Sequence, residues 1–161
     1  MKSTEKTKLQ YQYQNSPLGR LRLVAEAQYL RRIEFEGQHG KDGEETPSPI
    51  LEDCKKQLEE YFQGKRESFS LALNADGTAF QQRIWQALQT IPYGELRSYR
   101  DIAEQTGNHK AVRAVGAANG KNPLPIVVPC HRVIGSNGSL TGFAGGLPAK
   151  KTLLQLEGIT I

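Results

Sequence analysis

The chain has 161 residues, of which 37% are hydrophobic, and its 21 Lys and Arg against 17 Asp and Glu give a formal net charge of +4. This length suits one domain or two small ones with a real hydrophobic core, and the composition is that of an ordinary globular protein. The small positive charge allows an acidic partner but does not require one.

The sequence carries no signal for a membrane or secreted protein. No apolar run approaches the roughly 20 residues needed to span a bilayer, and residues 1–8 lack the apolar core of a signal peptide. The two cysteines do not make a disulfide framework, and the three histidines form no cluster at zinc spacing. We therefore expect a cytoplasmic protein that contacts no membrane and needs no metal or cofactor.

Alternating apolar residues in the first third of the chain predict β-strands. Three segments show this alternation, at residues 9–13, 21–23 and 30–35. A Ser-Pro-Leu-Gly turn at residues 16–19 separates the first two. The pattern predicts an antiparallel meander.

A helix and one more strand complete this part of the chain. After a polar loop at residues 37–49, residues 49–63 have the apolar spacing of a helix, which Gly64 ends. Cys54 lies on the apolar face of that helix, so we expect it to be core packing. Residues 69–73 alternate again and predict a final strand. No catalytic constellation is visible here, and the part is interpreted as a supporting α/β domain.

A cluster of turn-forming residues at 74–77 marks the expected domain boundary, which gives domains at residues 1–75 and 76–161. The second domain is predicted to be mainly helical. Thr78 and Gln81 have the spacing of a capping box at the start of its first helix. The apolar face of that helix carries Phe80, Ile84, Trp85 and Leu88.

Two short helices follow, and a glycine joins them. Ser98 and Asp101 make a second capping box, and Gly107 ends the helix that they begin. Asn108 can cap the next helix, which is expected to run to about Asn119. This is a helix-turn-helix pattern, although any small helical hairpin produces it.

The second of these helices is almost without side chains. Its small residues allow another surface to approach the backbone closely, and tight packing on a neighbouring helix explains some of them. That packing does not explain Arg113, which is long and cationic among them. The small residues are Ala111, Ala114, Gly116, Ala117 and Ala118.

The most unusual stretch is residues 123–135, where prolines flank an apolar, β-branched run that leads into Cys130, His131 and Arg132. The prolines hold the chain extended and cannot donate to a central ladder, so we predict a rigid, edge-like strand. A thiol in apolar surroundings is normally inert, but a neighbouring imidazole or guanidinium can lower its pKa below about 8.5. Cys130 is thus either a small core residue or a reactive thiol.

The last segment offers two further features with two interpretations each. The glycine-rich loop at residues 142–146 can fold over a flat ligand or serve as a plain connector. Pro148 fits the first turn of a final helix that Gly158 ends. Glu157 lies in its last turn, where the macrodipole disfavours an anion by roughly 0.3–1 kcal/mol. It is either a solvated surface residue or a carboxylate that orients His131.

Together these segments resemble a known family. The sequence PCHRV at residues 129–133, with Asn122 and Pro123 before it and GFAGG at residues 142–146 after it, resembles the active-site signature of the O6-alkylguanine-DNA alkyltransferases. The resemblance is strong over about the last half of the chain and loose over the first. Further matching segments are FQQRIW at 80–85, IPYG at 91–94, RAVGAAN at 113–119 and LLQLEG at 153–158.

The resemblance implies a fold and a reaction. The fold would be α+β, with a small ribonuclease H-like α/β domain carrying an antiparallel sheet, followed by a mainly helical, winged helix-turn-helix-like domain that binds DNA and transfers the alkyl group. The substrate would be double-stranded DNA containing O6-alkylguanine, and activity on O4-alkylthymine is left open. The base must be flipped out, at a cost of a few kcal/mol. Transfer to Cys130 would be irreversible, so each molecule acts once.

The same resemblance assigns the catalytic roles. Cys130 would attack the alkyl carbon, His131 would act as base, and Glu157 would fix the histidine tautomer. Because adjacent residues on a strand point to opposite faces, we expect His131 to reach the thiol through a water. Tyr99 would donate a hydrogen bond to the departing purine.

DNA contacts and the pocket are assigned in the same way. The small-residue helix would enter the minor groove, and Arg113 would fill the space of the flipped base. Asn122 would brace the turn before the Cys130 segment. Many family members carry tyrosine where Phe143 stands, so stacking would survive without the hydroxyl. The remaining DNA-binding residues are Ala114, Gly116 and Ala117, and the pocket residues are Asn119, Val133, Phe143 and Ala144.

Two other classes of function are alternatives to this one. A Cys-His hydrolase would need a carbonyl substrate and an oxyanion hole, and no third motif indicates either. A DNA binder that senses damage without repairing it is the other alternative, since relatives exist that keep the fold and replace the cysteine. The presence of Cys130 argues against that alternative.

Overall fold

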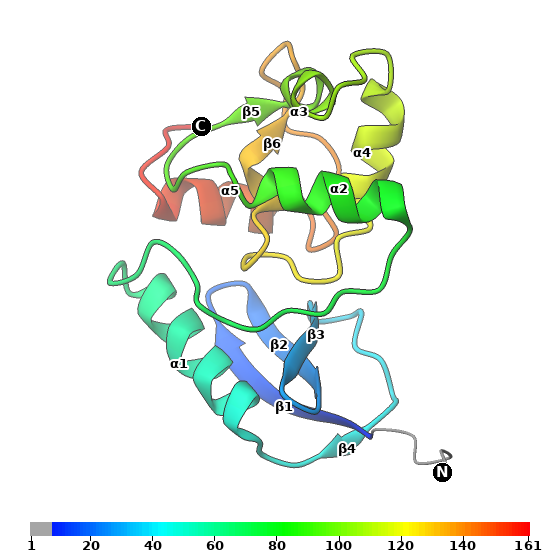
Figure 1. Cartoon of the computed structure of the whole chain (residues 1–161). Coiled ribbons are helices and arrows are strands. Elements are labelled where there is room, and N and C mark those ends of the chain that lie inside the picture. The colour runs from blue at the N-terminus through cyan, green and yellow to red at the C-terminus, as the bar shows by residue number, and fades with distance from the viewer. Residues whose placement is uncertain (1–7) are drawn as a thin grey trace. The chain divides into compact units, whose positions relative to one another are not determined.

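The computed structural model describes residues 8–161, and the chain forms two compact units, residues 1–75 and 76–161 (Figure 1). The signal-peptide interpretation concerned residues 1–8, of which residues 1–7 lie outside the described part. Within residues 8–161, no helix is long and apolar enough to cross a bilayer.

Unit 1 is built on a four-stranded sheet whose strand order is β3-β2-β1-β4. Three strands, β1 (Leu9–Ser16), β2 (Gly19–Glu26) and β3 (Tyr29–Glu34), form the antiparallel meander that the sequence predicted. The short strand β4 (Glu44–Glu45) pairs in parallel with β1 and was not predicted, because two glutamates carry no apolar alternation.

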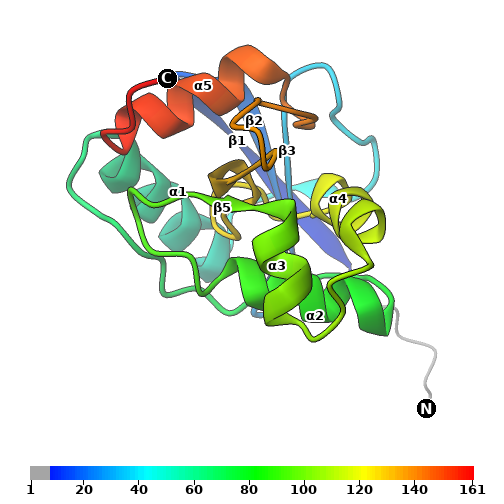
Figure 2. The same ribbon diagram turned by 90° about the horizontal axis from the view of Figure 1, so that it is seen from above.

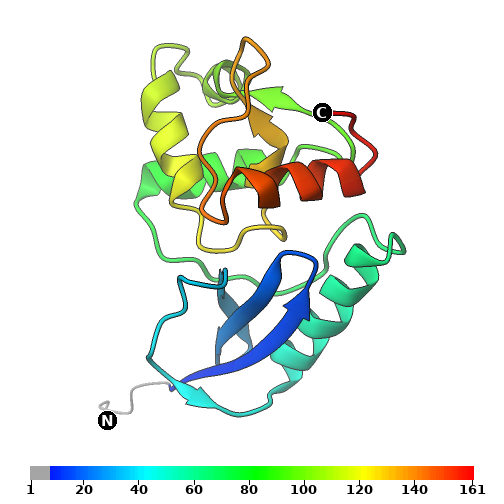
Figure 3. The ribbon, with the colours of Figure 1, turned by 180° about the vertical axis from the view of Figure 1, so that it is seen from behind.

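One face of this sheet is covered by helix α1 (Pro49–Phe62), as Figure 3 shows. The Ser48 hydroxyl accepts a hydrogen bond from the Leu51 N–H, and Pro49 occupies the first helical turn, so both start signals act. The predicted helix is confirmed to within one residue at its end. Cys54 is fully buried in the core, as expected.

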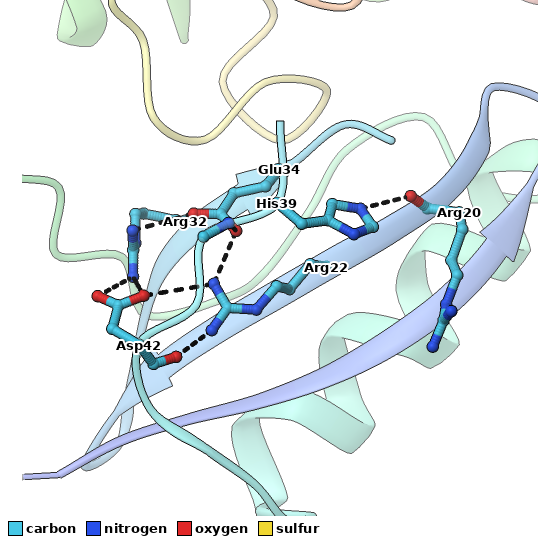
Figure 4. Close-up of polar contacts among 7 residues, drawn as sticks. Arg20, Arg22, Arg32, Glu34, His39 and Asp42 are labelled. Atoms are coloured by element: carbon cyan, nitrogen blue, oxygen red, sulfur yellow. Dashed lines mark hydrogen bonds and ion pairs between the residues drawn. The ribbon is translucent and has the colours of Figure 1, made fainter. Parts of the chain in front are cut away.

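The opposite face of the sheet carries a polar group, the unit 1 cluster, formed by Arg22, Arg32, Glu34 and Asp42 (Figure 4). Arg22 is fully buried and donates to Glu34 Oε1 at 2.7 Å and to the Asp42 carbonyl. Arg32 donates to the Asp42 carboxylate at 2.9 Å and pairs with Glu34 Oε2 at 2.9 Å. Beside this cluster, His39 bonds the Arg20 carbonyl at 2.8 Å. These bonds hold the loop after β3 against the sheet.

The strand predicted at residues 69–73 is wrong. Only a single bridge forms there, between Leu30 and Leu73. The backbone of Ser70 bonds the side chain of Gln57 instead, with its N–H donating to Gln57 Oε1 at 2.9 Å and its carbonyl accepting from Gln57 Nε2 at 3.1 Å. A buried side chain has therefore replaced the ladder that an apolar alternation normally indicates.

Unit 2 begins with three helices that lie together, α2 (Ala79–Leu88), α3 (Tyr99–Gln105) and α4 (Val112–Gly120) (Figure 2). Both predicted capping boxes, at Thr78 and at Ser98, are present. The buried indole of Trp85 donates to the Ala118 carbonyl at 2.8 Å and thereby ties α2 to α4.

The start of α4 differs from the prediction. Asn108 does not cap the helix, because residues 108–111 form a separate turn in which the Ala111 N–H donates to the Asn108 carbonyl at 3.0 Å. The helix begins at Val112, and its N-terminus has no side-chain cap. It extends to Gly120, one residue beyond the expected end at about Asn119.

Two short parallel strands and a last helix complete unit 2. They are β5 (Arg97–Ser98), β6 (Val133–Ile134) and α5 (Leu147–Leu156). Gly158, in the left-handed conformation with φ of 86°, follows the end of α5 as predicted.

Candidate active site

The segment that carries Cys130 is not a strand, which corrects the prediction. Residues 125–128 form turns, Cys130–Arg132 form one 3-10 turn, and only Val133–Ile134 are extended. The N–H groups of this segment bond nearby carbonyls instead of a neighbouring strand, as when Val128 donates to Leu124 and Cys130 donates to Val128. Proline-rich segments with few free donors favour such local bonding.

The 3-10 turn sets the directions of the reactive side chains. Successive residues of a 3-10 helix are rotated by about 120°, so the Cys130 thiol and the His131 ring point in different directions. All three side chains of the turn are buried. The expected reason for an indirect contact between Cys130 and His131, their placement on opposite faces of a strand, is therefore wrong, although the two groups are still held apart.

A buried ionic group, the unit 2 cluster, is formed by His131, Arg132 and Glu157. Glu157 Oε2 bonds His131 Nε2 at 2.7 Å, and Glu157 Oε1 accepts from Arg132 Nε at 2.8 Å. Arg132 also donates to the Ile91 carbonyl at 2.7 Å, and the Gly94 N–H donates to Glu157 at 3.0 Å. Glu157 is thus no solvated surface residue, and the structure brings it to His131.

This cluster fixes the protonation of His131. Burial lowers the pKa of the imidazole, and the hydrogen bond that the ring donates to Glu157 only partly opposes that effect. The ring is therefore neutral near pH 7, with its Nε2 proton donated to the carboxylate. Nδ1 is buried and has no hydrogen-bond partner among the described residues, so it presents a lone pair that can accept a proton.

Cys130 does not have the lowered pKa that its neighbours suggested. Burial dominates and raises the pKa of the thiol to about 11, while the Asn122 side chain and the charge of Lys150 act in the opposite direction. His131 is neutral and the charge of Arg132 is paired with Glu157, so neither group can supply the expected stabilisation of a thiolate. The resting thiol is protonated at neutral pH.

Lys150 is the residue that sequence reasoning missed. It is fully buried in α5, and its ammonium group donates to the Val133 carbonyl at 2.6 Å and to the Thr141 carbonyl at 2.9 Å. Burial lowers the pKa of Lys150 to about 8. A signal was available, because Leu153 and Leu154 follow at three and four residues and place Lys150 on the apolar face of the helix.

Two asparagines connect the Cys130 segment to α4. Asn119 is buried and donates to the Cys130 carbonyl at 3.4 Å. Asn122 donates to the Val128 carbonyl at 2.8 Å and accepts from the Leu124 N–H at 3.0 Å, so its side chain spans the turn. These bonds fix the backbone on either side of Cys130.

A cavity of about 530 Å³ opens between α3, α4 and the loop after β6. Its wall includes five of the predicted site residues, whereas Cys130, His131, Glu157 and Asn122 lie outside it, as do Ala114, Ala117, Asn119 and Val133. Within this wall, the Thr141 hydroxyl and the Tyr99 phenol are hydrogen-bonded at 2.9 Å. The lining residues are Tyr99, Val112, Arg113, Gly116, Gly120, Thr141, Gly142, Phe143 and Ala144.

The exposed residues of α4 complete the site. Arg113, Ala114 and Ala117 are exposed, whereas Val115 and Ala118 pack inward. Packing on α2 and α3 therefore accounts for part of the small-residue pattern, and an exposed stripe remains. Among residues 8–161, no group of three or more His, Cys, Asp or Glu side chains could hold a metal ion.

Comparison with known proteins matches the two units to two domains of one family. Residues 9–75 match the family of the 6-O-methylguanine DNA methyltransferase, ribonuclease-like domain, and residues 79–159 match its DNA binding domain. The constitutive methylated-DNA--protein-cysteine methyltransferase of Bacillus subtilis is 49% identical over 93% of this chain and 96% of its own. A protein of the same name from Haemophilus influenzae is 46% identical over 95% and 88%.

Solved structures agree with the fold. The crystal structure of Mycobacterium tuberculosis O6-methylguanine methyltransferase superposes with a TM-score of 0.86 at 44% identity, covering 92% of each chain. The structure of Mycobacterium tuberculosis OGT in complex with DNA gives 0.85 at 46% identity, covering 92% of this chain and 93% of the other. These matches confirm the predicted α+β fold and its two parts. The chain belongs to the 6-O-methylguanine DNA methyltransferase family.

Proposed function

We propose that this protein repairs DNA by transferring the alkyl group of O6-alkylguanine to the sulfur of Cys130. Its similar relatives are named for methylated DNA as substrate and a protein cysteine as acceptor. The observation that carries the assignment to Cys130 is its place beside a neutral His131, whose Nδ1 has no hydrogen-bond partner within residues 8–161. Cys54, by contrast, lies in the core of unit 1, where burial raises its pKa to about 12.

The reaction moves one alkyl carbon and one proton. The thiol proton passes to His131 Nδ1 through a water, because no direct bond joins the two side chains among the described residues. The sulfur electron pair then forms the S–C bond while the C–O6 bond breaks, and its electrons pass to the guanine, which takes up a proton. A thioether carbon has no polarised carbonyl for water to attack, so the protein is not regenerated.

The surrounding residues support both the deprotonation of the thiol and the departure of the purine. Glu157 holds the His131 tautomer and stabilises the imidazolium that forms. Asn122 and the charge of Lys150 favour the thiolate as it develops. On the other side, Tyr99 lines the cavity and is placed as the hydrogen-bond donor to the departing purine.

DNA binding is assigned to unit 2 through the minor groove. Residues 76–161 hold nine Lys and Arg against five Asp and Glu, whereas residues 1–75 hold twelve of each, so this half carries the whole net charge. The exposed small residues Ala114 and Ala117 let the α4 backbone approach the duplex. Arg113 is exposed and lines the cavity, which suits a side chain that fills the space of a flipped base.

We also place the protein in the cytoplasm. Both cysteines are free thiols, which is the usual state in a reducing compartment. Alkyl transfer requires that state, because an oxidised Cys130 has no nucleophilic sulfur.

The test is a mass measurement after incubation with a duplex that contains O6-methylguanine. We expect one added methyl group per molecule, mapped to Cys130, with no turnover after the first. Cys130→Ala should lose all transfer and still bind the duplex, and Cys54→Ala should transfer normally. Repeated turnover by one molecule, or a methyl group on Cys54, would contradict the proposal.

A further inference from the structure

Tyr99 shares a hydrogen bond with Thr141, a residue of the cavity wall to which the proposed reaction gives no role. The hydroxyl oxygens of Thr141 and Tyr99 are hydrogen-bonded at 2.9 Å, and both residues line the cavity. They come from different elements, since Tyr99 begins α3 and Thr141 belongs to the loop after β6. The bond therefore joins two walls of one cavity.

Thr141 is held in place from its other side. Its carbonyl accepts from the Lys150 ammonium group at 2.9 Å, and the same ammonium group binds the Val133 carbonyl at 2.6 Å. Lys150 is fully buried and its bond to Val133 is buried, while its bond to the exposed Thr141 is partly buried. The backbone of Thr141 is thus fixed to α5 while its side chain reaches α3.

The direction of this hydrogen bond decides what Tyr99 can do. A phenol has one proton to donate and can also accept hydrogen bonds through its oxygen. When Thr141 donates to that oxygen, the Tyr99 proton stays free for an acceptor in the cavity, and accepting a bond makes the phenol a stronger donor. If Tyr99 instead donated to Thr141, its only proton would be occupied.

We propose that Thr141 is a positioning residue, whose hydroxyl donates to Tyr99 and so directs the phenol proton at the purine that leaves the alkyl carbon. This inference rests on the proposed function. Thr141 itself exchanges no proton and acts only through Tyr99. The purine departs with the electron pair of the broken C–O6 bond, and the directed hydrogen bond stabilises the charge that this pair creates.

The test compares single-turnover transfer from saturating O6-benzylguanine to the full-length protein. Loss of one oriented hydrogen bond corresponds to about a 3- to 10-fold slower rate. We expect that loss in Thr141→Val, recovery in Thr141→Ser, and a loss at least as large in Tyr99→Phe. Adding Thr141→Val to Tyr99→Phe should cost nothing more, because the proton that Thr141 directs is already gone.

The matched control is Thr152→Val, which makes the same hydroxyl-to-methyl change at a residue that donates to the Pro148 carbonyl outside the cavity lining. Its rate should equal that of the wild type. An unchanged or faster transfer rate in Thr141→Val would overturn the inference. It would also be overturned if Thr141→Val slowed transfer by the same factor in the wild type and in the Tyr99→Phe variant. Failure of the proposed function would look different, because the wild type itself would carry no alkyl group on Cys130.

Discussion

Two glutamates, one in each unit, lie in nearly the same chemical setting. Glu34 Oε1 accepts from Arg22 at 2.7 Å and from the N–H of a glycine at 2.9 Å. Glu157 Oε1 accepts from Arg132 at 2.8 Å and from the N–H of a glycine at 3.0 Å. Both arginines are buried. In each unit the carboxylate offsets a cation that has lost its water.

The two clusters differ in the second partner that each glutamate binds. Glu34 binds Arg32, a cation that holds a loop, and no thiol belongs to that cluster (Figure 4). Glu157 binds His131, which follows Cys130 directly in the chain. His131 is a neutral base whose Nδ1 has no partner in the described part of the chain. By itself, a buried arginine–carboxylate pair therefore stabilises only the fold. It contributes to a reaction when the carboxylate also orients a group that can accept a proton.

The largest expected effect comes from matched amide substitutions of the two glutamates. Glu157→Gln leaves a buried arginine without its anion and should cost about 3–5 kcal/mol of unfolding free energy, with a smaller cost for the less buried Glu34→Gln. Transfer should fall roughly 100-fold in Glu157→Gln, because a neutral amide no longer stabilises the imidazolium. It should stay within about twofold of wild type in Glu34→Gln. Single-turnover rates and urea unfolding check both expectations.

The temperature of this comparison matters, since an unfolded variant also loses activity. Rates are therefore measured where circular dichroism shows both variants folded. If Glu34→Gln slows transfer as much as Glu157→Gln does, the distinction between the structural and the catalytic cluster is wrong.

A smaller effect concerns pH and the thiol of Cys130. With a pKa of about 11, the thiol should react with iodoacetamide about tenfold faster for each unit between pH 6.5 and 7.5, because that reagent needs a preformed thiolate. Transfer from O6-benzylguanine should stay flat over this interval. His131, whose pKa is lowered, is already neutral there and can accept the proton during the reaction.

The two slopes are measured on the same Cys54→Ala protein, so that only one thiol responds. A tenfold rise of the transfer rate per pH unit would show that a preformed thiolate attacks the substrate. His131 would then have no role as base, and the unit 2 cluster would be structural like its counterpart in unit 1.

Local signals predicted much of this fold. The capping boxes at Thr78 and Ser98 were readable because their partners lie three residues further along the chain. The strands at residues 69–73 and 123–135 were wrong for a common reason. Neither the apolar alternation at residues 69–73 nor the proline-flanked, β-branched run at residues 123–135 says whether a ladder partner is present. The backbone there bonds Gln57 or its own turns instead.

The site was predicted unevenly for a related reason. The resemblance of the motif around Cys130 to a known family indicates which residues react. The charges that act on the thiol, however, depend on contacts between residues that are far apart in the sequence. Lys150 reaches a carbonyl 17 residues away, and Glu157 reaches His131 over 26 residues. Adjacency in sequence suggested that His131 and Arg132 lower the pKa of the thiol, whereas their charges are tied up in the cluster with Glu157.

The smallest expected effect tests how much the unit 1 cluster depends on charge at its exposed end. The Asp42 side chain is 53% exposed and accepts two hydrogen bonds from Arg32 at 2.9 Å, which hold the pKa of its carboxyl below the usual 3.8. A carboxyl with a lowered folded pKa stabilises the protein above pH 3.8, and this stabilisation disappears as the pH falls through the folded pKa. Solvent screening limits it to under about 1 kcal/mol. Asp42→Asn should therefore unfold at a slightly lower urea concentration than the wild type at pH 7. At about pH 2 the two proteins should unfold at the same urea concentration. If the difference between their urea midpoints is as large at pH 2 as at pH 7, the role of Asp42 does not depend on its charge.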